Sequence, residues 1–121
     1  MTREEAIRKH RILWNAIADE TERKRYIVDK PEAFFKCFHN EKKPLNYCFL
    51  CEYNRYNVNA CANCLLERDK EESKTGCLGG LFTEWCNANS WQECARIARE
   101  IANLPERGKA GVYENQQRNG A

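Results

Sequence analysis

Residues 48–64, CFLCEYNRYNVNACANC, hold four cysteines in two CxxC pairs that are separated by nine residues. Within each pair, the two intervening residues allow a tight turn that presents both thiolates to one metal ion. Two such turns complete a tetrahedral four-sulfur site, although the separation is shorter than in most zinc ribbons. The pattern therefore predicts one Zn²⁺ bound by Cys48, Cys51, Cys61 and Cys64. Because protein fills all four positions, the zinc would be structural.

The same cysteines are open to other interpretations. The chain has eight cysteines, which could be reduced core residues or form disulfides, and four thiolates can also hold an iron–sulfur cluster. A redox-active pair is disfavoured because no βαβ pattern surrounds either CxxC. Cys77, which follows Gly76, is a rival ligand that could replace one of the four. Cys37, Cys86 and Cys94 lie on apolar faces of predicted helices, so we expect them to be small core residues.

The balance of charge narrows the class of partner. The chain has 20 Lys and Arg residues against 18 Asp and Glu residues, a formal net charge of +2. Four zinc-bound thiolates and the Zn²⁺ ion would lower this charge to about zero. The chain therefore lacks the general positive field that drives non-specific DNA binding, and an anion could be recognised only by a local basic patch.

Length and hydropathy predict one cytoplasmic domain. The 121 residues suit a single zinc-stabilised domain over residues 1–107, with a polar, glycine-containing flexible tail at residues 108–121. The start, MTREEAIRKHRILWNA, has no uninterrupted apolar stretch of the kind found in signal peptides. No segment approaches the roughly 18 apolar residues of a membrane span. We therefore expect a cytoplasmic protein with reduced thiols and no membrane partner.

The first helix is the longest predicted element. Thr2 and Glu5 form a capping box, and nothing interrupts the helix before about Val28. At 1.5 Å per residue, it would be roughly 40 Å long. Its apolar residues share one face, with His10 or Arg11 filling the remaining turn: Ile7, Trp14, Ile17, Ala18 and Thr21.

Three shorter helical segments are expected further along the chain. Asp29, Pro31 and Glu32 mark the start of a short helix that leads into a loop at residues 39–46, where His39 lies. Residues 81–89 predict a helical turn or two. A second S-x-x-E box at residues 90–93 begins a C-terminal helix that Pro105 ends. The apolar stripe of that helix is formed by Cys94, Ile97, Ala98 and Ile101.

These elements predict a mainly α fold. The long N-terminal helix would pack with the C-terminal helix, and the four-cysteine zinc knuckle would be inserted between them. The C-terminal helix, about 14 residues long, would cover only half of its longer partner. We therefore expect the uncovered apolar surface, flanked by Ile12 and Leu13, to be buried in a homo-oligomer, most simply a two-fold dimer.

Basic and aromatic side chains are the candidates for binding a ligand. They are Arg8, Arg11, Arg23 and Arg25 of the first helix and Tyr53, Arg55 and Tyr56 of the knuckle loop. The first two arginines are three residues apart and share a face, whereas the other two are two apart and do not. Arginine with aromatic rings suits a nucleotide-like anion. The alternatives are a solvated helix face with i,i+4 ion pairs, and packing of the loop around the zinc.

The chain carries no sequence motif typical of an enzyme. It has no phosphate-binding glycine loop, no nucleophile elbow and no H-x-E beside the CxxC pairs of the kind that zinc deaminases use. Glu52 directly follows Cys51, but beside a closed zinc site we expect it to be a surface group. The sequence therefore predicts a non-catalytic protein.

Three motifs occur in order along the chain: REEAIRKHRILWNAIADET, YCFLCEY…CANCLL with GCLGGLFTEW, and ARIAREIANLPER. This series, which covers residues 2–107, resembles a family of small, uncharacterised phage and prophage proteins from Gram-positive bacteria. It implies a metal-binding role for the same four cysteines, with Cys77 as a further family-like cysteine. The family has no settled activity.

The phage context suggests what such a protein would do. Small accessory proteins of phage regions often counter host defence or modulate host enzymes. We expect a non-catalytic anti-defence protein in the bacterial cytoplasm, which sequesters a nucleotide-derived immune signal or blocks a host defence protein. The alternative is a nucleic-acid-binding zinc-knuckle protein.

Overall fold

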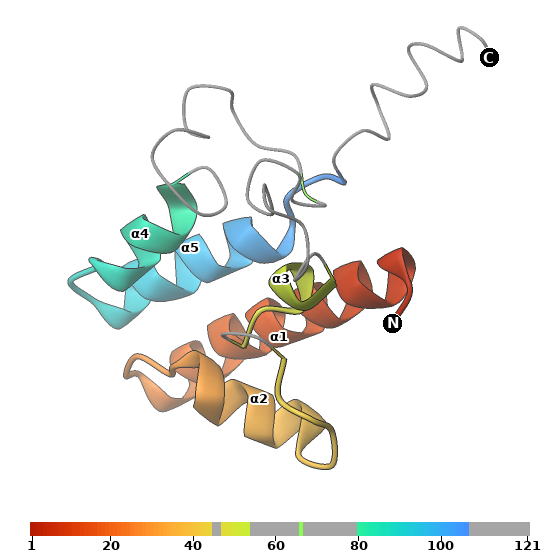
Figure 1. Cartoon of the computed structure of the whole chain (residues 1–121). Coiled ribbons are helices and arrows are strands. Elements are labelled where there is room, and N and C mark those ends of the chain that lie inside the picture. Colours follow the sequence, from red (N-terminus) through yellow and green to blue (C-terminus); the bar gives the residue numbers. More distant parts are fainter. Residues whose placement is uncertain (45–46, 54–65, 67–79, 107–121) are drawn as a thin grey trace, which may run out of the picture.

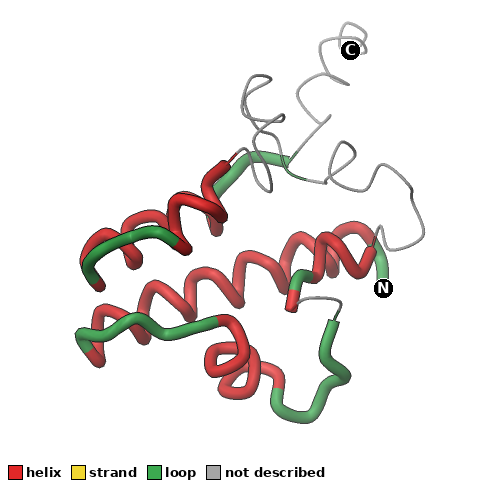
Figure 2. The backbone as a smooth tube through the Cα atoms, turned by 60° about the vertical axis from the view of Figure 1, so that its left-hand side comes forward, coloured by secondary structure: helices red, strands yellow, loops and turns green. Residues whose placement is uncertain are grey.

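Helix α1 is the element around which the other helices are arranged. The computed structural model describes residues 1–44, 47–53, 66 and 80–106. In these residues the helices are α1 (Arg3–Lys24), α2 (Lys30–Phe38), α3 (Phe49–Tyr53), α4 (Leu81–Cys86) and α5 (Trp91–Ala102). α4 and α5 lie on one side of α1 and α2 lies on the other, with α3 beside its N-terminal half (Figures 1 and 2). The predicted helical fold, with the first and last helices packed together, is confirmed.

Helix α1 begins where the sequence predicts and ends earlier. Thr2 Oγ1 accepts the Glu5 amide at 3.1 Å, and the Glu5 carboxylate accepts the Thr2 amide at 3.0 Å, which makes the capping box reciprocal. The expected continuation to about Val28 is wrong, because Arg25 takes the left-handed conformation and ends the helix. The chain then folds back, so that Val28 is fully buried and its amide reaches Thr21 Oγ1 at 3.2 Å. Burial of this β-branched residue outweighs another turn of helix.

The other two caps form with only one of their two hydrogen bonds. Asp29 and Ser90 each accept the backbone amide three residues later, at 3.0 and 3.1 Å, as predicted. The carboxylate of Glu32 instead pairs with Lys24 at 2.6 Å, and that of Glu93 pairs with an arginine of its own helix. Each cap still satisfies one free amide of its helix.

The apolar stripe of α1 is buried within one chain. Its members are at most 4% exposed, and the stripe of α5 packs against it. The aromatic rings of α4 cover Trp14, with centroids 5.0 Å away for Trp85 and 6.3 Å for Phe82. We expected a second subunit to bury the apolar surface of α1 that α5 does not cover. In the structure, α2, α3 and α4 cover that surface within the same chain, so it gives no reason for a dimer. Ile12, at 38%, stays exposed.

No helix in the described part of the chain has both the length and the apolar character needed to cross a membrane.

His10 joins the two longest helices from inside the core. The prediction that it fills a turn of the stripe is confirmed, since it is 1% exposed. Its Nε2 donates to the carbonyl oxygen of Ile101 in the last turn of α5, at 3.1 Å. Burial lowers the pKa of His10 to about 4, although the hydrogen bond to Ile101 opposes this shift. The imidazole is therefore neutral at pH 7.

We predict that acid destabilises the protein through His10. Its pKa is lower in the folded protein than in the unfolded chain, where it is about 6.5, so the unfolded state binds the proton more tightly. The stabilisation from neutral His10 is complete above the unfolded pKa of about 6.5, and it is lost as the pH falls toward the folded pKa of about 4. Between pH 7 and pH 5, the free energy of unfolding should fall by roughly 2 kcal/mol.

Denaturant titration of the wild type and of His10→Gln at both pH values measures this contribution. Glutamine keeps a donor for the Ile101 carbonyl and does not titrate. The variant should therefore lose less stability between the two pH values, by about the same 2 kcal/mol. An equal pH dependence in both proteins would contradict the assignment.

Candidate zinc and ligand sites

The first CxxC pair forms a turn of the shape that a zinc knuckle needs. The Cys51 amide donates to Cys48 Sγ at 3.2 Å, and the Glu52 amide donates to the Cys48 carbonyl at 2.9 Å. The two residues between the cysteines, Phe49 and Leu50, are 3% and 1% exposed and enter the core, while both cysteines are half-buried. The turn is therefore anchored in the core by the side chains of Phe49 and Leu50, while its two cysteines are partly buried.

This geometry favours the thiolate of Cys48. Hydrogen bonding with the Cys51 side chain is the largest influence, and it lowers the pKa of Cys48 to about 7 against the effect of burial. The Cys51 amide, the positive charge of Lys30 and the Leu50 amide act in the same direction. The thiolate is the form of cysteine that binds a metal ion, so a lowered pKa is what a ligand role of Cys48 would need.

The second pair, Cys61 and Cys64, and the rival ligand Cys77 lie outside the described residues. Within those residues, no three His, Cys, Asp or Glu side chains form a group that could hold a metal ion. Leu66, two residues after Cys64, is 1% exposed and forms an isolated antiparallel bridge with Glu106. α3 and Leu66, the described residues on either side of the second pair, therefore both pack into the fold.

The remaining described cysteines divide between core and surface. Cys94 is 1% exposed, as predicted, and its thiol donates to the Trp85 carbonyl at 3.8 Å. Cys37 is half-buried. The prediction that Cys86 is a core residue is wrong, since it is exposed. Helix α4 is short and turns Trp85 into the core, which leaves the next residue facing solvent.

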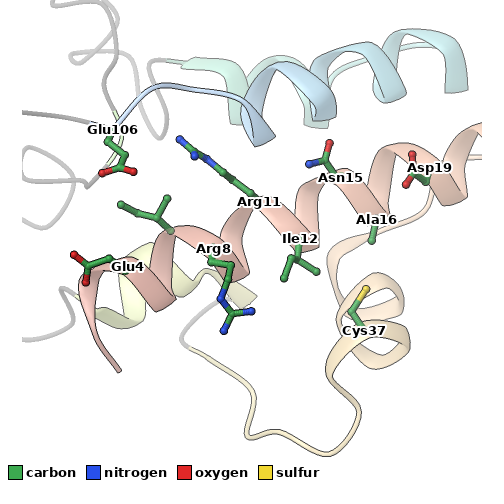
Figure 3. Close-up of a pocket in the computed structure, with 10 residues that line it drawn as sticks. Glu4, Arg8, Arg11, Ile12, Asn15, Ala16, Asp19, Cys37 and Glu106 are labelled. Atoms are coloured by element: carbon green, nitrogen blue, oxygen red, sulfur yellow. The ribbon is translucent and has the colours of Figure 1, made fainter. Parts of the chain in front are cut away.

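Arg8 and Arg11 line one surface pocket, but their charges do not converge. The α1 pocket has a volume of about 600 Å³ and is lined by Glu4, Ile7, Arg8, Arg11, Ile12, Asn15, Ala16, Asp19, Cys37 and Glu106. Arg11 points toward the chain that follows α5, where its Nη2 donates to the Leu104 carbonyl at 2.9 Å, and Arg8 points the other way (Figure 3). Arg8 has no hydrogen bond or ion pair with another described residue.

Two of the three carboxylates that line the α1 pocket, Asp19 and Glu106, are already paired. Asp19 accepts from Arg99 of α5 at 2.7 Å, and Glu106 pairs with Arg3 at 3.0 Å. Arg8 lies on α1 between Glu4 and Ile12, and the side chains of Arg8 and Ile12 point to the same side of the helix, where Cys37 of α2 also lies (Figure 3). The middle of the pocket therefore presents a positive charge beside an apolar strip.

The second pair of candidate arginines lies at the other end of α1. Arg23 is bound to Glu20 at 2.6 Å, and Glu20 also accepts from Lys36 of α2 at 2.7 Å. These two hydrogen bonds lower the pKa of Glu20 to about 2. Arg25 is exposed and forms the left-handed C-cap of the helix. Neither arginine lines the α1 pocket, so the four arginines do not form one site.

The aromatic candidates are only partly described. Tyr53, the last residue of α3, is 42% exposed and is not among the residues that line the α1 pocket. Arg55 and Tyr56 lie outside the described residues. His39 is the exposed C-cap of α2, consistent with the predicted loop position.

Sequence reasoning missed two features of these sites. Lys30 acts electrostatically on Cys48 from 18 residues earlier in the chain, and Arg11 is engaged by a carbonyl 93 residues away. No local sequence signal reports either contact.

Comparison with protein-family models, curated proteins and solved structures found no match.

We predict that protein purified under reducing conditions contains one zinc ion per chain by elemental analysis. Cys51→Ser should lose the metal and lower the melting temperature strongly, because the binding free energy of a structural zinc is also folding free energy. Cys86→Ser is the matched control, since that cysteine is exposed and belongs to no CxxC pair. Disulfides at the CxxC cysteines in fresh reduced protein would contradict the zinc assignment.

Proposed function

We propose that this protein is a non-catalytic, zinc-stabilised binding protein of the phage accessory class that its sequence resembles. In this proposal it acts in the bacterial cytoplasm by occupying a surface of a host defence protein. The four CxxC cysteines hold a structural Zn²⁺, and the α1 pocket contacts the partner. The observation that carries the binding role is the uncommitted Arg8 beside the apolar strip of this pocket.

The length of the α1 pocket supports a protein partner. Residues 4, 8, 12 and 16 lie one above another on α1, and the lining continues to Asp19. From residue 4 to residue 19, the fifteen rises of helix span roughly 22 Å, which suits a helical or extended segment of a partner. The matching segment would carry apolar side chains for Ile12 and a carboxylate for Arg8.

Capture of a nucleotide-derived signal is the weaker branch of the proposal. It needs several cations and an aromatic ring at one place, but Arg11 and Arg23 are bound to groups of the protein itself. Tyr53 lies outside the pocket. Nucleic-acid binding is weaker still, because the basic side chains of α1 alternate with carboxylates and the chain has almost no net charge.

The first test of the binding role compares partner capture by the wild type and by the variant Arg8→Glu. Tagged wild-type protein should capture a defined protein from a lysate of a Gram-positive host, and Arg8→Glu should lose it. Calorimetry with that partner, once purified, should show an affinity at least tenfold lower for the variant. Lys42→Glu is the control, because it reverses an exposed charge outside the α1 pocket.

The same calorimetry distinguishes the branches. Binding of a cyclic nucleotide or an ADP-ribose derivative would favour capture of a small ligand over a protein partner. Tight binding of duplex DNA would favour the nucleic-acid alternative. Equal capture by the wild type and Arg8→Glu would remove the α1 pocket from the proposal.

Self-association is proposed on a different surface from the one that the sequence indicates. Phe35 is 70% exposed on the outer side of α2, which is unusual for so large an apolar ring. We expect light scattering to give twice the chain mass of 14.2 kDa at micromolar concentration. Phe35→Glu should return the mass to that of one chain, whereas Ile27→Glu, at a second exposed apolar position, should not. A monomeric wild type would reject self-association.

A further inference from the structure

One face of α2 is directed at the first half of the zinc knuckle. The Phe34 ring packs against the rings of Tyr47 and Phe49, with centroids 5.5 and 6.1 Å apart. These two residues flank Cys48 in the sequence. Lys30 lies four residues before Phe34 on the same helix, so the two side chains share a face. The α2 face that holds Lys30 is therefore the face beside the knuckle.

Contacts with two other elements restrict the position of the Lys30 ammonium. Its Nζ lies 4.6 Å from the centroid of the Phe82 ring on α4, and the side chain is only partly exposed. The charge also lowers the pKa of buried His10 on α1, after the effects of burial and Arg11. The ammonium thus lies between α1, α2 and α4, close enough to Cys48 to act on it electrostatically.

We propose that Lys30 balances the charge of the zinc site. Four thiolates around one Zn²⁺ carry a net charge of about −2. The knuckle is half-buried, where an ion is poorly screened and a neighbouring cation is worth more than at an open surface. An ammonium cannot ligate zinc, so Lys30 acts as a positioning residue that favours the thiolates from beside them. This inference rests on the proposed zinc site.

The assignment gives the α2–α3 junction a second role. The aromatic contacts between Phe34 and the knuckle hold the turn in place, and the lysine one turn earlier on α2 supplies the charge.

Zinc affinity measured by chelator competition at fixed pH tests the proposal. Lys30→Met keeps most of the aliphatic stem and removes the charge, so it should weaken zinc binding about tenfold. Lys30→Arg keeps the charge and should retain most of the affinity. Lys42→Met, which removes an exposed charge outside the knuckle, should bind zinc as the wild type does. Lys30→Gln repeats the measurement if Lys30→Met does not fold.

The outcomes separate this inference from the zinc site itself. Cobalt substitution should give the same thiolate-to-metal absorption bands in the wild type and all variants, because the ligands are unchanged. Equal affinity in the wild type, Lys30→Met and Lys30→Gln would overturn the role of Lys30 and leave the zinc site standing. An arginine variant as weak as the methionine one would show that packing matters and charge does not. A wild type that binds no zinc would overturn both.

Discussion

The C-terminal end of α5 is fixed by two consecutive side chains of α1. A helix end leaves carbonyl groups without partners, and these must be satisfied where the end is not open to water. His10 Nε2 reaches the Ile101 carbonyl in the last turn, and Arg11 reaches the Leu104 carbonyl just beyond it. These hydrogen bonds set the position of α5 along α1. The covering elements α2, α3 and α4 then pack around that pair.

The sequence predicts the helices well because their signals are local. The caps at Thr2, Asp29 and Ser90 depend on residues three positions apart, and the apolar stripes depend on spacings of three and four. The early end of α1 was missed because Val28 gains its burial from tertiary packing. The prediction that Cys86 is buried was wrong because consecutive residues of a helix point about 100° apart, so burial of Trp85 directs Cys86 to solvent.

The ligand site was harder to predict for a related reason. Composition shows which arginines are present, but their availability depends on partners elsewhere in the fold. Arg11 donates to the Leu104 carbonyl after the end of α5, and Arg23 forms an ion pair with Glu20, which also binds α2. Arg8 alone of these three is left to face the α1 pocket without a described partner. The turn at Cys48 and Cys51 follows from the CxxC spacing, because its hydrogen bond between the Cys51 amide and Cys48 Sγ is local.

The ion pair between Arg3 and Glu106 joins residues 103 positions apart at a distance of 3.0 Å. The first turn of α1 and the segment after α5 therefore meet at one corner of the fold, beside the bridge that Glu106 forms with Leu66. A domain whose entrance and exit coincide can be inserted into a surface loop of a carrier protein without separating the two sides of that loop. The same corner is where a peptide fused before residue 3 would emerge, beside Leu66.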